Sequence, residues 1–261
     1  MNGIRLSFES LEASPQLQVA RITLARPPLN ILDIPAILEL SQAIVEAEER
    51  PEVRAVVLAA EGEKAFSVGV EVRDHTAERV GEMLGAFHQV FRVLARTEKI
   101  TLAAVRGFCL GGGCELATFC DLVVAADNAQ FGQPEIQLAC FPPVAAITFP
   151  RLIGEKKAAE LLLTGKRIGA AEAAALGLVN RVTPAAELET AVGQLLRELF
   201  QNSAAALCLA KRALRLGSAE DFDRRLEAVE RLYVEELMRT RDCQEGILAF
   251  LEKRPPAWSH S

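Results

Sequence analysis

Two glutamates in apolar surroundings are the residues of this sequence whose types and spacing could do chemistry. Glu115 follows three consecutive glycines in RGFCLGGGCELATFCD, and Glu135 lies further on in FGQPEIQLACFPP. A carboxylate in an apolar helix costs free energy unless it is used. The stretch between them, DLVVAADNAQF, predicts one strand and a return, which would bring both carboxylates to one pocket. Such a pair can move a proton and steer a water molecule.

The three glycines, Gly111 to Gly113, fit neither of the common nucleotide-binding loops. A phosphate loop needs Lys and Ser/Thr after its last glycine, whereas Cys114 and Glu115 follow here. A dinucleotide loop spaces its glycines as G-x-G-x-x-G, whereas these are consecutive. What remains is a strand that leads directly into a helix. Its free N–H groups form a site for developing negative charge, and glycines allow close approach. The alternative is a tight turn that needs glycine only for packing.

The cysteines of the same stretch do not have the spacing of a zinc site. Cys109, Cys114 and Cys120 are five and six residues apart, whereas zinc ligands come in closely spaced pairs. The whole chain has six cysteines and three histidines. We interpret the cysteines as small buried hydrophobic side chains of a reduced protein, and we predict no metal site.

Composition argues against nucleic-acid and membrane partners. The net charge is −6 and the pI is about 5.3, which does not suit a chain that coats anionic polymers or lipid. No apolar run approaches the roughly 20 residues that cross a bilayer. The start, MNGIRLSFES, lacks the apolar centre of a secretory signal. We therefore expect a cytoplasmic protein.

Alternation of strands and helices predicts an α/β fold. Expected strands lie at 4–12, 17–25, 53–61, 66–70, 101–107 and 121–127, and expected helices at 33–49, 77–97 and 111–120, with a turn at Ser14-Pro15. From about Glu155 the segments are helical, and the last is one long helix over 219–254. We expect an α/β core over residues 1–195 and a C-terminal helical region over 196–261.

One further glycine, Gly69 in KAFSVGVEV, places a second backbone N–H at a strand end. Two N–H donors with two glutamates suit a reaction that passes through an enolate. At this point the sequence resembles the enoyl-CoA hydratase/isomerase (crotonase) superfamily. The resemblance is carried, in order, by KAFSVGVEV, RGFCLGGGCELATFCD, FGQPEIQL, LLLTGKRIGAAEAAALGLVNRV and FLEKRPPAW.

The resemblance implies a spiral of repeated ββα units with a C-terminal helical trimerisation region. It implies that the N–H groups of Val70 and Gly112 form an oxyanion hole for a thioester carbonyl. Glu115 would activate a water molecule and Glu135 would exchange a proton at the α-carbon. The implied coenzyme A contacts are Lys64, Val68, Arg73, Phe250 and Lys253, and the implied acyl pocket contains His75, Phe141, Pro142 and Pro143.

The resemblance further implies that coenzyme A is part of the substrate, so no separate cofactor is expected. The implied partners are an acyl-CoA thioester and further copies of the chain, as a trimer or a dimer of trimers. The implied reaction adds water to an α,β-unsaturated acyl-CoA or removes it. The alternatives are double-bond isomerisation and a non-catalytic binding protein of the same fold. The His88 side chain is expected in the core, because it lies on an amphipathic helix.

Two departures from the family pattern affect the acyl pocket. Val68 and Val70 replace alanines and add bulk near the thioester. Pro142 and Pro143 stand where the family has glycines, and a proline has no N–H to donate. The FPPVAA stretch, together with DHT at 74–76, is similar to cyclic dienoyl-CoA hydratases that act on cyclohexa-1,5-diene-1-carbonyl-CoA. We therefore expect the departures to decide the substrate.

Overall fold

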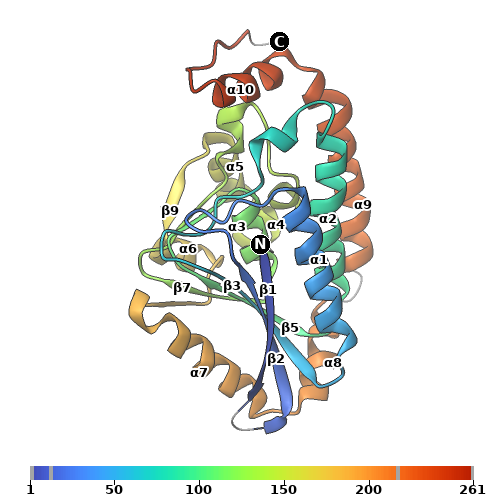
Figure 1. The fold of residues 1–261 in the computed structure, drawn as a ribbon, viewed down its shortest axis with the longest axis vertical. Coiled ribbons are helices and arrows are strands. Elements are labelled where there is room, and N and C mark those ends of the chain that lie inside the picture. Colours follow the sequence, from blue (N-terminus) through green and yellow to red (C-terminus); the bar gives the residue numbers. More distant parts are fainter. Residues whose placement is uncertain (1–2, 12–13, 216–217, 260–261) are drawn as a thin grey trace.

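The computed structural model describes residues 3–11, 14–215 and 218–259, which form two sheets with helices packed around them (Figure 1). The strands are β1 (Ile4–Leu11), β2 (Ser14–Leu24), β3 (Val53–Ala60), β4 (Ala65–Ser67), β5 (Ile100–Val105), β6 (Phe108–Leu110), β7 (Leu122–Ala126), β8 (Gln130–Gly132), β9 (Arg167–Gly169) and β10 (Arg181–Thr183). The α-helices are α1 (Ile34–Glu49), α2 (Val80–Arg96), α3 (Gly112–Phe119), α4 (Pro143–Ile153), α5 (Glu155–Thr164), α6 (Ala170–Leu176), α7 (Leu188–Phe200), α8 (Ala204–Leu214), α9 (Ser218–Arg231) and α10 (Arg241–Leu251). The 3₁₀ turns are Val72–His75, Pro134–Leu138, Ala185–Glu187 and Leu237–Arg239, and a π-helical turn spans Leu232–Glu236.

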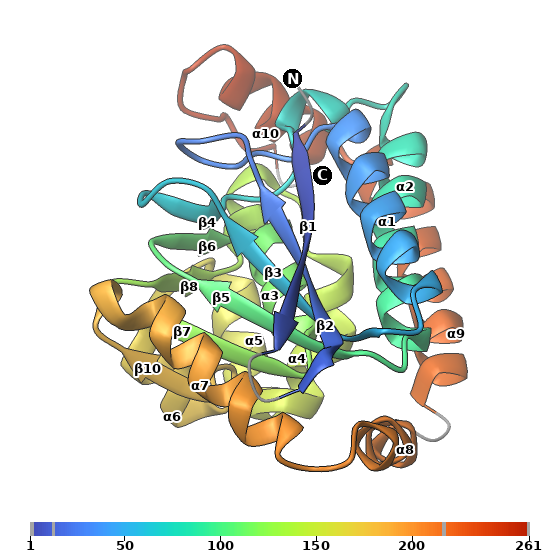
Figure 2. The same ribbon diagram turned by 60° about the horizontal axis from the view of Figure 1, so that its bottom comes forward.

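The chain builds both sheets at once. The larger sheet has the order β1-β2-β3-β5-β7-β10 and the smaller has the order β4-β6-β8-β9. Each repeat gives one strand to each sheet and then a helix: β3 and β4 precede α2, β5 and β6 precede α3, and β7 and β8 precede α4. Within each sheet the strands of successive repeats pair in parallel (Figure 2). The predicted spiral of ββα units is therefore confirmed.

The expectation that only helices follow Glu155 is wrong. Strand β9 pairs with β8, with Ile168 opposite Phe131, and β10 pairs with β7, with Val182 opposite Ala125. Each of these strands has only three residues, so neither shows a period that distinguishes it from the helices around it. Both sheets therefore extend beyond the part of the sequence that alternates visibly.

The expected single helix over 219–254 is also wrong, because the chain turns between α9 and α10. A π turn and a 3₁₀ turn follow α9, and Thr240 then begins α10 as its N-cap, its hydroxyl accepting from the Cys243 N–H at 3.1 Å. Near the N-terminus, Ser14 and Pro15 belong to strand β2 rather than to the expected turn, since β2 begins at Ser14.

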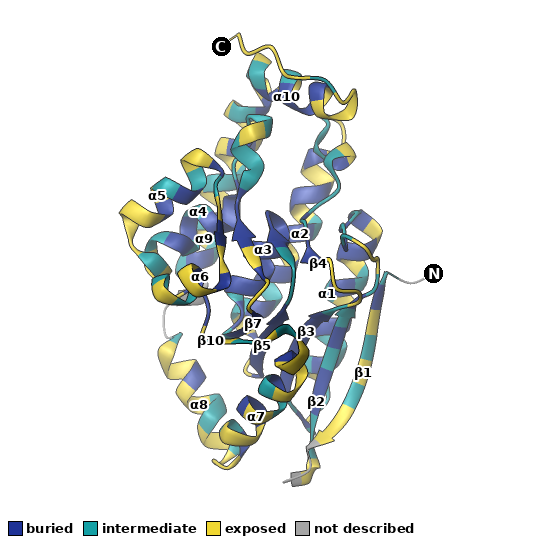
Figure 3. Cartoon of the chain, turned by 90° about the vertical axis from the view of Figure 1, so that its left-hand side faces the viewer, coloured by how far each residue is buried: buried dark blue, intermediate teal, exposed yellow. Residues whose placement is uncertain are grey.

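Helices α1, α2 and α9 lie side by side along one flank of the sheets in both ribbon views (Figures 1 and 2). The apolar spacing predicted for the middle helix is confirmed, since the side chains in question are all buried: Val80, Met83, Leu84, Phe87, Phe91 and Leu94. All six cysteines are free, and five of them are buried, as predicted. Figure 3 shows buried residues gathered on α3 and α4 and exposed faces on α7 and α8. Among the described residues, no helix is both long and apolar enough to span a bilayer.

Helix α3 approaches the end of strand β4 very closely. A Cβ placed on Gly113 would lie 2.5 Å from the Ser67 carbonyl oxygen, nearer than real Cβ contacts come. Because the blocking atom belongs to backbone, only movement of the helix or the strand could relieve the clash. Glycine at this position therefore sets the separation between β4 and α3.

We expect Gly113→Ala to push α3 away from β4 and to lower the melting temperature. Gly85→Ala is the matched control, because Gly85 is exposed on α2 and a Cβ there meets nothing within 4 Å. The control should stabilise the protein by roughly 0.5–1 kcal/mol, the usual gain from replacing glycine in a helix. Thermal unfolding of both variants measures the difference. Equal melting temperatures would show that the close approach constrains nothing.

Candidate active site

Three neighbouring parallel strands end at one cavity of about 570 Å³. Strand β4 leads to Gly69 and Val70, β6 leads to Gly111 and Gly112, and β8 leads to the turn that carries Glu135. The carboxyl ends of parallel strands share one edge of a sheet, which is where ligands of such sheets bind. The order of the strands therefore brings together residues from three separate motifs.

The N–H groups of Val70 and Gly112 are available to a ligand. Gly69 O and Glu71 N, on either side of Val70, both bond to Leu32, at 3.0 and 2.9 Å, and the Val70 N–H donates to no backbone oxygen in the described chain. Gly112 is the first residue of α3, so its N–H has no partner within the helix. A Cβ on Gly69 would lie 2.9 Å from the Gly112 nitrogen. The two strand ends are therefore in contact where the donors lie.

Glu115 lies on the first turns of α3 and is only 2 % exposed. Its Oε1 accepts a hydrogen bond from the Ala145 N–H at 2.7 Å. Burial raises the pKa of Glu115 to about 7, and the N–H groups of Ala145 and Val144 oppose the shift. These residues follow Pro142 and Pro143, which begin α4 without donors of their own. Pro142 and Pro143 cannot donate, and the next two residues of helix α4 provide the N–H groups that face the Glu115 carboxylate.

Glu135 follows Pro134 in a 3₁₀ turn and faces the glycine loop. A Cβ on Gly111 would lie 2.7 Å from Glu135 Oε1. The Gln133 amide, with its nitrogen toward the acceptors, donates to both carboxylate oxygens at 3.3 Å and to Gly111 O at 3.2 Å. Burial and then the charge of Glu115 raise the pKa of Glu135 well above its usual range.

The two glutamate carboxyl groups have different hydrogen-bond donors and charges around them. Glu115 has backbone donors that favour its ionised form. Desolvation and then the nearby charge of Glu115 raise the pKa of Glu135. The two carboxyl groups therefore lie in different environments, and their like charges oppose ionisation of both at once. A pair of carboxyl groups arranged in this way can act as base and acid in one reaction.

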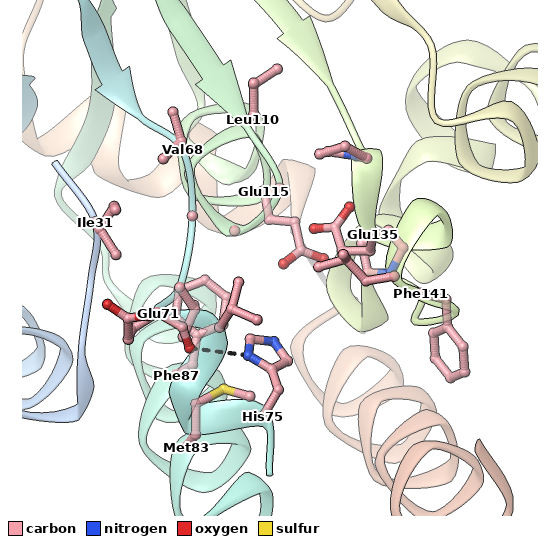
Figure 4. A pocket seen from close by; sticks show the side chains of 18 of the residues that line it. Ile31, Val68, Glu71, His75, Met83, Phe87, Leu110, Glu115, Glu135 and Phe141 are labelled. Carbon is pink, nitrogen blue, oxygen red and sulfur yellow. Dashed lines mark hydrogen bonds between the residues drawn. The ribbon is translucent and has the colours of Figure 1, made fainter. Parts of the chain in front are cut away.

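Most of the residues singled out in the sequence lie on the cavity wall (Figure 4). They are Lys64, Val68, Val70, His75, Gly112, Glu115, Glu135, Phe141, Pro142, Pro143 and Phe250. Arg73 and Lys253 are exposed and are not part of that wall. The structure therefore brings together both glutamates, both N–H donors and the expected acyl-pocket residues, and it leaves two of the expected coenzyme A contacts outside.

Four of the residues that sequence reasoning did not place at the site bear on its chemistry or shape. Phe87 and Tyr233 line the cavity from α2 and the π turn, Arg167 lines it from β9, and Gln133 bonds to Glu135. Tyr233 is the chain's single tyrosine and lies in a mostly charged helical stretch, which is a signal that could have been followed. Gln133 directly precedes Pro134 in the quoted motif. Phe87 and Arg167 have no local signal, because only pairing of distant elements brings them to the cavity.

The family profile described as enoyl-CoA hydratase/isomerase matches residues 15–261. The chain belongs to this family. It is 39 % identical over 240 residues to the cyclohexa-1,5-dienecarbonyl-CoA hydratase of Thauera aromatica, covering 92 % of each chain. It is 38 % identical to the short-chain-enoyl-CoA hydratase of Clostridium acetobutylicum, covering 91 % of this chain and 92 % of the relative. A solved enoyl-CoA hydratase structure from Mycobacterium avium subsp. paratuberculosis superimposes with a TM-score of 0.86 at 28 % identity, covering 98 % of each chain.

The raised pKa values predict that the two glutamates lower stability as pH rises. The pKa of Glu115 rises from 4.5 in the unfolded chain to about 7, so ionisation opposes folding between these values. Glu115→Gln should therefore match the parent in melting temperature near pH 4. The free energy of unfolding of the variant should exceed that of the parent by an amount that grows toward pH 7, reaches up to about 3 kcal/mol and then levels off.

Thermal unfolding across pH measures this effect, with Glu82→Gln on the exposed face of α2 as the control that should change little. Glu135→Gln should likewise gain stability over the parent as the pH rises above the usual range of a glutamate, because the pKa of Glu135 is raised well above that range. A constant offset between the glutamine variants and the parent at every pH would contradict the assignment.

Proposed function

We propose that the protein is an acyl-CoA hydratase that adds water to an α,β-unsaturated acyl-CoA, or removes it, and that its acyl group is compact and cyclic, as in a cyclic dienoyl-CoA. The observation that carries the proposal is the meeting, in one cavity, of two glutamates of raised pKa with two N–H groups that have no backbone acceptor among the described residues. Each component has a place in a reaction that passes through an enolate.

In the proposed reaction the thioester oxygen accepts hydrogen bonds from the Val70 and Gly112 N–H groups. The Glu115 carboxylate removes a proton from water as the water oxygen bonds to the β-carbon. The π electrons move onto the thioester oxygen, where the two donors stabilise the charge. Glu135 then gives its proton to the α-carbon, and the carbonyl re-forms. Dehydration follows the same steps in reverse.

The walls around the acyl end support a compact, flat substrate. Aromatic rings from three elements surround it: Phe87 from α2, Phe141 before α4, and Tyr233, which meets Phe141 edge-on at 5.1 Å between ring centres. Val68 and Val70 narrow the space beside the thioester. Apolar, rigid walls favour a planar ring over a long flexible chain, because the chain would lose more conformational freedom on binding. The similarity to the Thauera aromatica enzyme supports the same choice.

We propose that coenzyme A binds at the other end of the cavity. Lys64 and Arg167 supply positive charge there, and Val68 and Phe250 supply apolar surface. Arg73 and Lys253 lie on the exposed surface, so any contact they make with coenzyme A would be at its outer portion. Phe250 is 53 % exposed on α10, which leaves its ring free to contact a ligand.

We also propose that the chain assembles as a trimer or a dimer of trimers. Large apolar side chains are exposed on two C-terminal helices, among them Leu209 and Leu214 on α8, at 63 % and 86 %, and Leu248 on α10, at 47 %. Light scattering after size exclusion should give three or six times the chain mass. Leu214→Lys with Leu209→Lys should reduce that mass. A parent that elutes as a monomer at micromolar concentration would contradict the assembly.

The main alternative is double-bond isomerisation, which needs one carboxyl group to carry a proton between two carbons. The presence of a second glutamate in the cavity favours water addition instead. Mass spectrometry of the products separates the two, because hydration adds the mass of one water and isomerisation leaves the mass unchanged.

The test of the proposed function is turnover of an acyl-CoA panel containing crotonyl-CoA, a long straight-chain enoyl-CoA and a cyclic dienoyl-CoA. The parent should hydrate the cyclic thioester with the highest kcat/KM. Glu115→Gln and Glu135→Gln should each lower kcat by roughly 10²–10⁴, the usual contribution of a positioned acid or base. Glu82→Gln is the control and should match the parent. Full hydration activity in both cavity variants would refute the mechanism.

A further inference from the structure

The acyl end of the cavity holds a polar group that the proposed reaction does not use. His75 ends the 3₁₀ turn Val72–His75, and its ring lies on the cavity wall with Met83, Phe87 and Phe141 near it (Figure 4). An imidazole among apolar side chains has a cost unless both ring nitrogens find partners. The structure supplies a protein partner for only one of them.

Hydrogen bonding determines the tautomer of His75. Its Nδ1 lies 3.1 Å from the Glu71 carbonyl oxygen, and a carbonyl can only accept, so Nδ1 carries the proton. Burial lowers the pKa of His75, against smaller opposing effects of the Glu71 carbonyl and the charges of Asp74 and Glu71, so the ring is neutral at pH 7. In a neutral ring protonated at Nδ1, Nε2 presents a lone pair. No residue of the described chain bonds to Nε2.

The turn that carries this ring is held from two sides. The Glu71 N–H donates to Leu32 O at 2.9 Å. The buried Asp74 accepts from the Ile34 N–H at 3.2 Å and pairs with Arg79 at 2.8 Å. The position of the ring is thus set before any ligand arrives. A fixed acceptor of this kind can discriminate between ligands, because a ligand without a donor leaves it unpaired.

His88 makes a useful comparison on the same wall. Its Nδ1 lies 2.6 Å from Glu230 Oε1, and its Nε2 is buried without a hydrogen-bond partner. Its side chain is wholly inaccessible, whereas His75 keeps part of its surface open to the cavity. Of these two histidines, His75 is therefore the one that a ligand in the cavity can contact.

We propose that His75 Nε2 accepts a hydrogen bond from a hydroxyl group on the acyl portion of the substrate, beyond the double bond, and so selects hydroxylated acyl-CoA thioesters. This inference rests on the proposed hydratase function. A hydroxyl suits the site better than an ammonium group, because apolar side chains surround the ring and a cation would lose its hydration there. His75 is thus a specificity residue and takes no part in proton transfer.

The test compares matched pairs of substrates in the full-length protein. The pairs are crotonyl-CoA with γ-hydroxycrotonyl-CoA, and cyclohexenecarbonyl-CoA with its ring-hydroxylated derivative. The parent should favour the hydroxylated member by roughly tenfold in kcat/KM for at least one pair, as expected for one hydrogen bond that is left unmade in the other member. His75→Leu should abolish that preference. His75→Gln places an amide oxygen near the position of Nε2 and should restore part of it.

Met83→Leu is the matched control, because it alters the same wall without changing a hydrogen-bonding group and should leave the substrate ratio unchanged. Equal kcat/KM values for the two members of each pair in the parent would overturn the inference. So would a decrease in kcat/KM in His75→Leu that is the same for the hydroxylated and the unhydroxylated member. The parent ratio stands as a test even if His75→Leu fails to fold. Absence of hydration on every substrate would instead refute the proposed function, so the two failures are distinguishable.

Discussion

The close approach of strand β4 to the start of helix α3 is the contact on which the site depends. Two glycines permit it: Gly69 lies against the Gly112 nitrogen, and Gly113 lies against the Ser67 carbonyl. A side chain at Gly69 or Gly113 would meet backbone atoms first, so it would separate two backbone segments rather than displace a flexible group. The two N–H donors face one ligand atom only if this separation is kept. Preorganised donors need no rearrangement during reaction, which is why they are effective.

The second requirement is a place for two carboxyl groups in an apolar interior. The structure provides different hydrogen-bond donors to the two carboxyl groups. The start of α4 donates to Glu115, while Glu135 receives the Gln133 amide and lies beside a carboxyl group of like charge. Desolvation raises the pKa of both groups, so their ionisation lowers the stability of the fold as the pH approaches neutrality. Stability given up for activity is typical of active sites.

The proposed acyl end of the cavity combines apolar walls with one oriented acceptor. Phe87 and Phe141 define a flat space, and the His75 ring is fixed by the Glu71 carbonyl with its lone pair free. Apolar walls alone discriminate weakly between substrates that differ in one hydroxyl, because they offer nothing for the hydroxyl to bond to. In the proposed binding mode, a fixed acceptor adds that discrimination without changing the reaction at the thioester.

The sequence by itself determined the components. The glycine run, the two glutamates and the apolar face of α2 each depend on residues close together in the chain, so their types and spacing predict a helix start, buried acids and a core face. The tertiary structure decided which residues from distant parts of the chain lie next to these components. Strands β6, β8 and β9 have three residues each and form only by pairing with one another, which places Arg167 beside Phe108 and on the cavity wall, while Arg73 and Lys253 remain outside. Pairing between distant segments leaves no local pattern, because its free energy comes from contacts that exist only after the chain has folded.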